Sequence, residues 1–529
     1  MSNRWFAVLA VGLLAGGFAT APSVAPAQEN VLVWGDQMVE TLDPHAAYDV
    51  PSSFVQLNVY DNLLRYQGNP PQLKPWLAES YAASKDGRTW TFNLRQGVRF
   101  HDGSELTAED VAYSFKRILA LNKATAGPFK AQLRPEGVSA VDKHTVKFVL
   151  DKPYAPFLST IPIATVVNRK VVEAHVKDGD WGAAWLSSNS AGSGAYIVDP
   201  SGYVPQKSVD LKRNPNHFLG WGHNPKPIDL VKARPVAETS TRVLALMKGE
   251  IDAGDSYLPT DQVERLQKTK NVVVQRNESM RIFIIRMNNT KPPFDNVHAR
   301  RCFSHAFNYD AFIKVILKNY AERNPAPIPK NLWGYPEGLK GYDFDLQKAK
   351  AECDRAKGEG APIGREVELH IQTALDQTTQ AAQLFQSDLK KIGINMRVVP
   401  NTWPNLTAST AKPETTPDMW IHWVSAYFID PENWIGTMYD SQFHGTWKAS
   451  AWYKNSKVDE LLRAARSNPN RDERTKMYRE AAKMVVEDAA DIWVYNTVEL
   501  RGISARLKGF TFSPVGSGNE LRFMSLASS

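Results

Sequence analysis

The stretch LAESYAASKDGRTWTFNLRQGVRFHDGSELTAEDVAYSF, at residues 77–115, carries the strongest local pattern in this chain of 529 residues. Within it, residues 89–95 alternate between apolar and polar side chains, as a half-buried strand does, and they follow the turn dipeptide Asp86-Gly87. Thr107 and Asp110 then have the spacing of a helix N-cap, and apolar residues follow them at helical intervals. The stretch therefore predicts a β-hairpin that leads into an amphipathic helix.

Two further segments of the chain have clear periodicity. Residues 138–150 predict a second hairpin, because apolar side chains alternate along its second arm. Residues 367–371 and 394–399 predict strands on either side of an amphipathic helix at 376–392. This β-α-β order is the building block of an α/β lobe.

The length and composition limit the class of protein. A single hydrophobic core stops growing near roughly 250–300 residues, so a chain of 529 residues predicts two large lobes or three smaller units. A composition of 43% hydrophobic and 22% charged residues excludes a disordered chain, a collagen-like repeat and a polytopic membrane protein. The net charge is +7, but acidic residues are interspersed with the basic ones, which speaks against a partner of the nucleic-acid class.

The first 27 residues have the three-part pattern of a secretory signal peptide. Arg4 supplies the positive charge, an apolar run extends from Phe6 to Ala19, and Ala25-Pro26-Ala27 offers a cleavage site. A transmembrane anchor is the alternative, but the run is shorter than the roughly 20 residues that span a bilayer. We therefore expect a soluble, periplasmic mature protein that begins near Gln28.

The two cysteines, Cys302 and Cys353, each fall inside a predicted amphipathic helix. This setting favours buried small side chains over a disulfide between them, which is the alternative in an oxidising compartment. Because they lack C-x-x-C spacing, they do not indicate a metal or redox site.

The sequence contains none of the common catalytic or cofactor motifs. It has no H-E-x-x-H, G-x-S-x-G or Walker A pattern, and no Rossmann glycine fingerprint follows a predicted strand. For an exported α/β protein this favours a binding protein over an enzyme, and we expect no cofactor and no bound metal.

Aromatic residues gather between Trp420 and Tyr453, where they make up ten of 34 residues. Core packing is one interpretation. However, tryptophan is seldom fully buried, and Asp430-Pro431, Gly436 and Gly445 interrupt the run as they would in loops. Because small-molecule sites are commonly aromatic clefts with a few polar groups, we expect at least two of these side chains to face a ligand. The ten are Trp420, Trp423, Tyr427, Phe428, Trp434, Tyr439, Phe443, Trp447, Trp452 and Tyr453.

Several motifs together resemble the family 5 extracellular solute-binding proteins, the peptide- and nickel-type receptors of ABC importers. The block at 77–115 carries the most specific part of this resemblance. The resemblance extends over nearly the whole mature chain, at 192–196, 211–215, 245–252, 288–294, 304–308 and 509–510.

The resemblance implies two α/β lobes in a periplasmic-binding-protein fold of class II type, cluster C-like. Lobe I would comprise 28–285 and a return segment, 500–529, with a β-rich subdomain that holds the hairpins at 84–150. Lobe II would comprise 286–499. A solute bound to both lobes would favour the closed form, which the permease of an ABC importer recognises, and the receptor would act as a monomer.

The resemblance also implies where the solute lies. In the oligopeptide and dipeptide receptors, a lobe II segment of the form Trp-x-Ala-Asp-Tyr-x-Asp/Glu-Pro supplies an Asp that pairs with the peptide's α-ammonium. The corresponding stretch here, 423–431, is one residue longer and has Ala426 in place of that Asp, unless Asp430 takes over its role. The predicted ligand-binding residues are Tyr48, Trp403, Trp420, Trp423, Ser425, Tyr427 and Asp430.

By the same resemblance, Tyr48 stands at a lobe I position that is acidic in the oligopeptide receptor, and Trp420 stands where that receptor has an arginine, so aromatic residues replace charged ones. This favours an opine-like or sugar-like conjugate, or a short or modified peptide, with an ordinary di- or oligopeptide as the alternative. A secreted hydrolase that uses Asp430 and Glu432 is a further alternative, and so is a nickel-type metal carrier that uses His422 and His444.

Overall fold

The structure is a computed structural model that describes residues 30–36, 39–47, 50–236, 238–254, 258–373, 375–515 and 519–527. The predicted signal peptide at 1–27 and the predicted ligand residue Tyr48 lie outside these ranges. Among the described helices, none is both long and apolar enough to cross a membrane.

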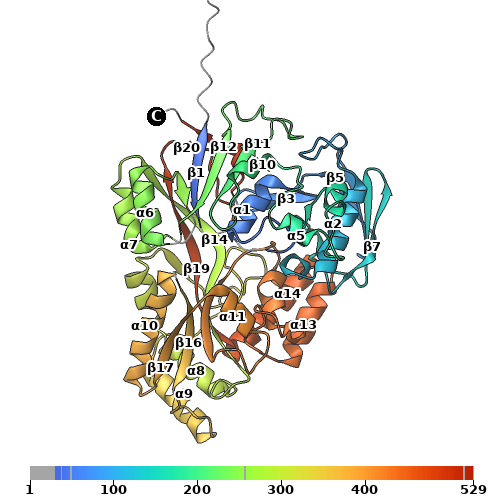
Figure 1. Ribbon diagram of the computed structural model, residues 1–529. Helices are drawn as coiled ribbons and strands as arrows, with labels where there is room; N and C mark the ends of the chain where they lie inside the picture. The colour runs from blue at the N-terminus through green and yellow to red at the C-terminus, as the bar shows by residue number, and fades with distance from the viewer. Residues whose placement is uncertain are drawn as a thin grey trace, which may run out of the picture.

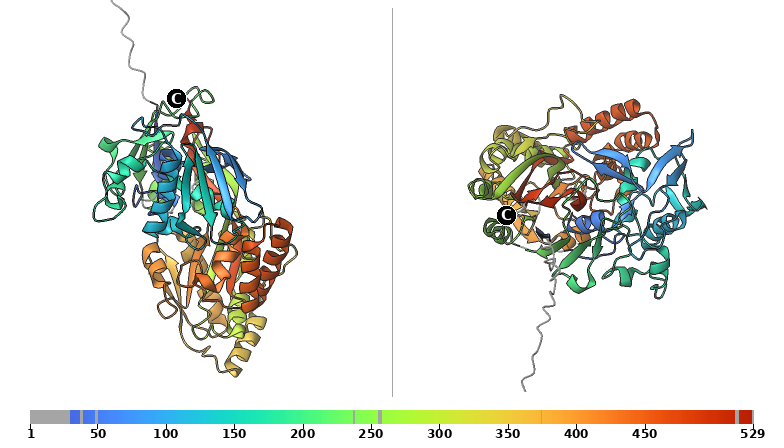
Figure 2. Two further views of the ribbon diagram at one scale, coloured as in Figure 1. Left: turned by 90° about the vertical axis from the view of Figure 1, so that its right-hand side faces the viewer. Right: turned by 90° about the horizontal axis from the view of Figure 1, so that it is seen from above.

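The molecule has two lobes stacked along its long axis, and one mixed sheet passes through both (Figure 1). The same division is visible from the side (Figure 2). We call the lobe that contains β1 lobe I and the lobe that contains β18 lobe II. Along the sheet the paired strands are β10 (Tyr196–Val198), β11 (Val209–Arg213), β12 (Leu230–Pro235), β1 (Val31–Asp36), β13 (Ala253–Gly254), β19 (Asp491–Ser504), β14 (Val272–Met287), β18 (Met419–Val424), β16 (Val367–Gln372) and β17 (Met396–Asn401), and β15 (Ala321–Arg323) also pairs with β19.

The two long strands β14 and β19 form the connection between the lobes. They pair antiparallel, and their register shifts between Glu278 and Ile282. On one side of this shift β19 pairs with β13 of lobe I, and on the other side β14 pairs with β18 of lobe II. The predicted lobe boundaries at 285/286 and 499/500 fall inside these strands and stay predictions.

Lobe I contains the β-rich subdomain, whose core is built from residues within 63–166 together with Phe428 of lobe II. The predicted hairpin is confirmed as β5 (Ala78–Ala83) and β6 (Thr89–Leu94), and the second one as β7 (Leu133–Asp142) and β8 (Thr145–Leu150). The predicted helix is α2 (Ala108–Leu121), which begins at the capping box of Thr107 and Asp110.

The other elements of lobe I surround its part of the sheet. They are α1 (Val50–Val59), β2 (Asp61–Asn62), β3 (Leu64–Gln67), β4 (Gln72–Pro75), α3 (Phe157–Thr160), β9 (Thr165–Val166), α4 (Arg169–Glu173), α5 (Ala183–Leu186), α6 (Thr239–Lys248), α7 (Thr260–Gln267), β20 (Leu507–Lys508) and β21 (Ser525–Leu526).

Helices cover both faces of the sheet in lobe II. The predicted β-α-β unit is confirmed as β16, α10 (Asp376–Lys391) and β17, with β16 and β17 parallel. Asn or Asp side chains cap the backbone N–H groups at the start of α8 (Val297–Ala306), α9 (Leu346–Gly358), α13 (Ser456–Ser467) and α14 (Arg471–Glu487). Two shorter helices, α11 (Trp403–Ser409) and α12 (Ile435–Tyr439), complete the lobe.

Cys302 and Cys353 form a disulfide that links α8 to α9, and the favoured interpretation as separate buried thiols was therefore wrong. Both helices have the predicted amphipathic character, and each places its cysteine in the same hydrophobic core. Their Cα atoms lie 5.2 Å apart, within the range that a disulfide spans. The sequence showed that both cysteines were buried, but it did not show that the two helices pack side by side.

Candidate ligand-binding site

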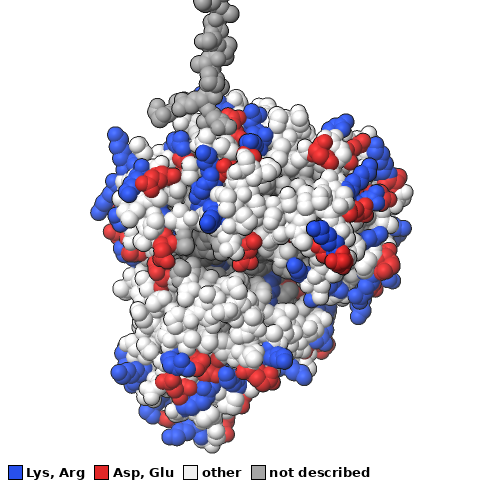
Figure 3. All heavy atoms as spheres, viewed as in Figure 1, with Lys and Arg blue, Asp and Glu red and all other residues white. Residues whose placement is uncertain are grey.

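A cavity of about 290 Å³ lies between the subdomain of lobe I and the segment of lobe II that follows β18. This volume is close to the lower end of the roughly 300–1,000 Å³ that small-molecule pockets occupy. The face of the molecule in Figure 3 is hollowed between the two lobes, and the lobe II atoms below this hollow are largely uncharged. Lobe I lines the cavity with Lys123, Gly127, Pro128, Lys130, Ala131, Gln132, Tyr154 and Ile163, and lobe II lines it with Tyr427, Phe428, Glu432, Thr437, Phe443, Thr446, Trp447 and Lys448.

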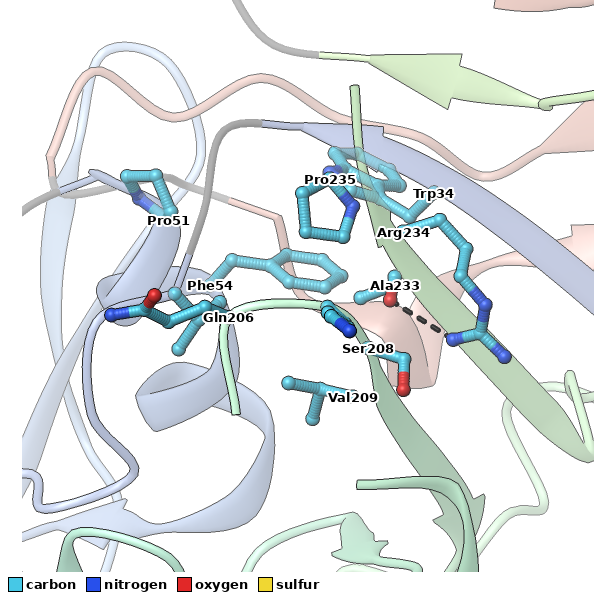
Figure 4. Close-up of a pocket in the computed structure, with 11 residues that line it drawn as sticks. Trp34, Pro51, Phe54, Gln206, Ser208, Val209, Ala233, Arg234 and Pro235 are labelled. Atoms are coloured by element: carbon cyan, nitrogen blue, oxygen red, sulfur yellow. Dashed lines mark hydrogen bonds between the residues drawn. The ribbon is translucent and has the colours of Figure 1, made fainter. Parts of the chain in front are cut away.

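Several smaller pockets lie elsewhere in the described part of the chain. One of about 70 Å³ shares Ile163 and Tyr427 with the main cavity. Another, of about 20 Å³, lies within lobe I between Trp34, Phe54 and Pro235 (Figure 4). The latter offers about the space that one water molecule needs, so it does not suit a solute.

Strand β18 sends its aromatic side chains to opposite faces of the sheet. Successive residues of a strand alternate, so Trp420 and His422 share one face and Trp423 points to the other. Trp423 packs edge-on against Phe283, with ring centroids 4.9 Å apart, and it lines a separate pocket of about 20 Å³ beside the crossing strands. Trp420 and Trp423 therefore do not form one continuous wall.

Behind the main cavity, Trp403, Trp420, His422 and Trp447 form a stacked aromatic cluster. The rings of Trp420 and His422 lie parallel at 4.1 Å, and Trp447 meets Trp403 edge-on at 5.2 Å. Trp447 also lies 6.5 Å from the ring of Tyr427, which lines the cavity. Two of the predicted residues, Trp403 and Trp420, thus support the cavity wall through Trp447.

His422 and His444, the pair considered for a metal carrier, have other partners. Burial and the nearby Arg286 hold the pKa of His422 well below its usual value. His444 is within hydrogen-bonding distance of the carbonyl of Tyr453, at 2.9 Å. Within the described part of the chain, no group of three or more His, Cys, Asp or Glu side chains is placed to hold a metal ion.

Asp430 is held inside lobe II by an arginine. Only 2% of its surface is exposed, and both carboxylate oxygens accept hydrogen bonds from Arg474 Nη2 at 2.7 Å. Glu432 accepts a bond from Arg466 Nε at 2.8 Å, and Arg466 Nη1 also donates to Asp440 at 2.9 Å. These carboxylates are therefore neutralised by guanidinium groups from α13 and α14.

The segment after β18 alternates in exposure. Ala426, which replaces the amine-binding Asp of the resemblance, is 1% exposed and packs in the apolar cluster of Val424 and Trp434. Ser425 is partly exposed, and its carbonyl accepts a hydrogen bond from Asn433 Nδ2 at 2.9 Å. Phe428 is 1% exposed, because it inserts into the core of the lobe I subdomain.

Comparison with known proteins decides the family. The sequence model of the bacterial extracellular solute-binding proteins, family 5 (middle) matches residues 72–445. The chain is also 31% identical, over 95% of both chains, to the probable D,D-dipeptide-binding periplasmic protein DdpA of Escherichia coli K12. The chain belongs to family 5 of the bacterial extracellular solute-binding proteins.

Solved structures of family 5 receptors have the same fold. The periplasmic binding protein DppA of Helicobacter pylori, in complex with the peptide STSA, matches with a TM-score of 0.84 and 26% identity over 94% of this chain and 98% of that one. AgaA of A. tumefaciens R10, in complex with agropinic acid, has a TM-score of 0.80 and 22% identity over 94% and 99%. Family 5 proteins are substrate-binding receptors that work with ABC permeases, and this chain is a solute-binding receptor of that kind.

Sequence reasoning missed several residues that line the cavity of this family 5 receptor. Lys448 has no motif around it, and Lys123 and Gln132 come from a segment that showed no periodicity. Phe428 and Trp447 belong to the aromatic run, but only the fold shows which of its ten members reach the cavity. The density of aromatic residues therefore indicated which region of the chain lines the cavity, but it did not indicate which of its residues do so.

Proposed function

We propose that this receptor is exported to the periplasm, binds a small solute between its lobes and delivers it unchanged to the permease of an ABC importer. The observation that carries this proposal is the cavity of about 290 Å³ that both lobes line, because a solute in it contacts both lobes and favours closure. The disulfide between Cys302 and Cys353 supports export, since such bonds persist in oxidising compartments. We propose that the receptor acts as a monomer.

Among the predicted ligand residues, Tyr427 has the best support, since it lines the cavity. We propose that it contacts the solute directly and that Trp403 and Trp420 hold Trp447 in place behind it. We propose that Ser425 and Trp423 border the space between the lobes on the side of the crossing strands β14 and β19. Tyr48 stays a prediction from the resemblance.

We propose two solute classes. The relative named for D,D-dipeptides and the complex of DppA with a peptide support a short peptide, and the complex of AgaA with agropinic acid supports an opine-like conjugate. Ala426 favours the second class or a modified peptide, because its own side chain offers no carboxylate to a peptide's α-ammonium.

A thermal-shift screen of the mature protein tests this proposal. The panel contains dipeptides, N-acetylated dipeptides, opines including agropinic acid, and oligosaccharides. A solute that binds only the folded state raises Tm, and we expect this for at least one of the first three classes. No increase with any member would contradict the proposal. Mass spectrometry after long incubation then checks that the solute is recovered unaltered, since breakdown products would indicate a hydrolase.

A further inference from the structure

Lys448 places an amine against the lobe II wall of the cavity. Its Nζ donates a hydrogen bond to Asn433 Oδ1 at 3.1 Å and lies 4.7 Å from the ring centre of Tyr427 and 5.9 Å from that of Trp447. No Asp or Glu oxygen of the described residues lies within 4.0 Å of this nitrogen. The amine is therefore held by the side-chain and backbone oxygens of Asn433 and by two aromatic faces, without an ion-pair partner among the described residues.

Among the described residues, none of the other charged groups that line the cavity forms an ion pair with Lys448. Glu432 is the acidic residue that lines the cavity, and it is paired with Arg466 at 2.8 Å. Lys123 and Lys130 line the cavity from lobe I and are exposed to solvent. The remaining titratable groups that face it are the phenols of Tyr154 and Tyr427. The cavity lining thus holds three lysines against one carboxylate that is already paired, and Lys448 is the partly buried one of the three.

We infer that the solute carries an anionic group, a carboxylate above all, and that Lys448 is the counter-ion that selects it. The inference rests on the proposed function and adds the charge of the ligand to it. A partly buried ammonium without a counter-ion gains most from an anion, whereas a cationic ligand group would be repelled. This arrangement has the opposite sign to the Asp that pairs with an ammonium in the peptide receptors, and the apolar position of Ala426 agrees with it.

Matched pairs of solutes test the inference. The screen is repeated at pH 6.5 with each acid of the panel beside its uncharged amide, for example N-acetyl-alanyl-alanine and its C-terminal amide. We expect the acid to bind at least 30-fold more tightly than its amide. If amides bind as well as acids, the inference is wrong and the proposed function stands. If no member binds, both fail.

Two variants assign the preference to Lys448. In K448M we expect the acid to lose at least 30-fold in affinity and to bind no better than its amide. K454M is the matched control, since it removes an exposed lysine that does not line the cavity, and we expect a loss of less than threefold. K448R keeps the charge and should keep the preference for the acid. A K448M protein that still prefers the acid, with a native circular-dichroism spectrum, would overturn the assignment.

The pH dependence of the wild type gives a second readout. Burial lowers the pKa of Lys448 to about 7, although Glu432 opposes the shift. An anion beside the ammonium raises that pKa, so binding above pH 7 takes up a proton. The dissociation constant should therefore be flat from pH 6 to 7 and rise by up to tenfold per pH unit above it. K448R should be flat to pH 9, and a wild type that is equally flat would contradict the inference.

Discussion

At the scale of single residues, Asp430 illustrates how a residue that resembles a ligand contact can have a structural task. Its two oxygens are bound by Arg474, which comes from the first turns of α14, and both side chains are buried. The segment that carries Tyr427 and Phe428 ends at this ion pair. Asp430 therefore anchors the cavity wall to the body of lobe II.

Replacing Asp430 by Asn should reveal this anchor. The change leaves the Arg474 guanidinium buried without its counter-charge, which typically costs about 3–5 kcal/mol of stability. We expect the free energy of unfolding of D430N, measured by urea denaturation, to fall by this amount. D354N serves as the control, because Asp354 pairs with Lys350 on an exposed helix surface, where such pairs contribute about 0–1 kcal/mol. Equal losses in the two variants would contradict the structural role.

At the scale of elements, the disulfide fixes α8 against α9 on one face of the lobe II sheet. It closes a loop with a sequence separation of 51 residues, and cross-links of this kind typically stabilise the folded state by about 2–4 kcal/mol. The double variant C302A/C353A should therefore unfold at a lower urea concentration than the wild type. In dithiothreitol the urea midpoint of the wild type should fall towards that of the variant. The midpoint of the variant itself should be the same with and without dithiothreitol. A wild type that unfolds identically with and without reductant would show that the bond contributes no stability.

The elements that the sequence predicted well are those whose signals are local. The hairpin of β5 and β6, helix α2 and the β16-α10-β17 unit follow from alternation, turn dipeptides and capping within about 40 residues. The sequence could not predict contacts between distant segments. The pairing of Cys302 with Cys353 depends on how α8 packs on α9. The ion pair of Asp430 depends on Arg474, which α14 brings beside it.

The aromatic run shows the same limit in the candidate site. Its first five residues belong to strand β18, although the Asp, Gly and Pro residues nearby indicated loops. Strand geometry then separates Trp420 from Trp423, which the density of aromatic residues could not reveal. Lys448 was missed for a further reason. A single lysine indicates an anion-binding site only when the fold shows that it has no carboxylate partner among the described residues.

At the scale of the whole molecule, the lobes touch each other away from the crossing strands as well. Backbone N–H of Ile429 donates to the Tyr66 hydroxyl at 3.2 Å, and backbone N–H of Ala155 donates to the carbonyl of Arg466 at 2.8 Å. Phe428 is buried in the hydrophobic cluster that forms the core of the lobe I subdomain. We call these contacts between the lobes, made by residues outside β14 and β19, the latch, and hinged lobes can form or break such contacts as a unit.

Truncation of Phe428 tests whether this latch contributes to solute capture. Burying a phenylalanine side chain contributes about 1.5–3 kcal/mol, and here that contribution is realised only when the lobes are closed. In F428A the closed form should lose this energy, so solute affinity measured by calorimetry should fall by roughly 10- to 150-fold. Small-angle scattering should show that more solute is needed to reach the compact radius of gyration.

F385A is the control for this test, since Phe385 is buried wholly within lobe II. This variant should lower Tm while the folded protein keeps its solute affinity. Wild-type affinity in F428A would mean that ligand contacts and the crossing strands alone determine closure.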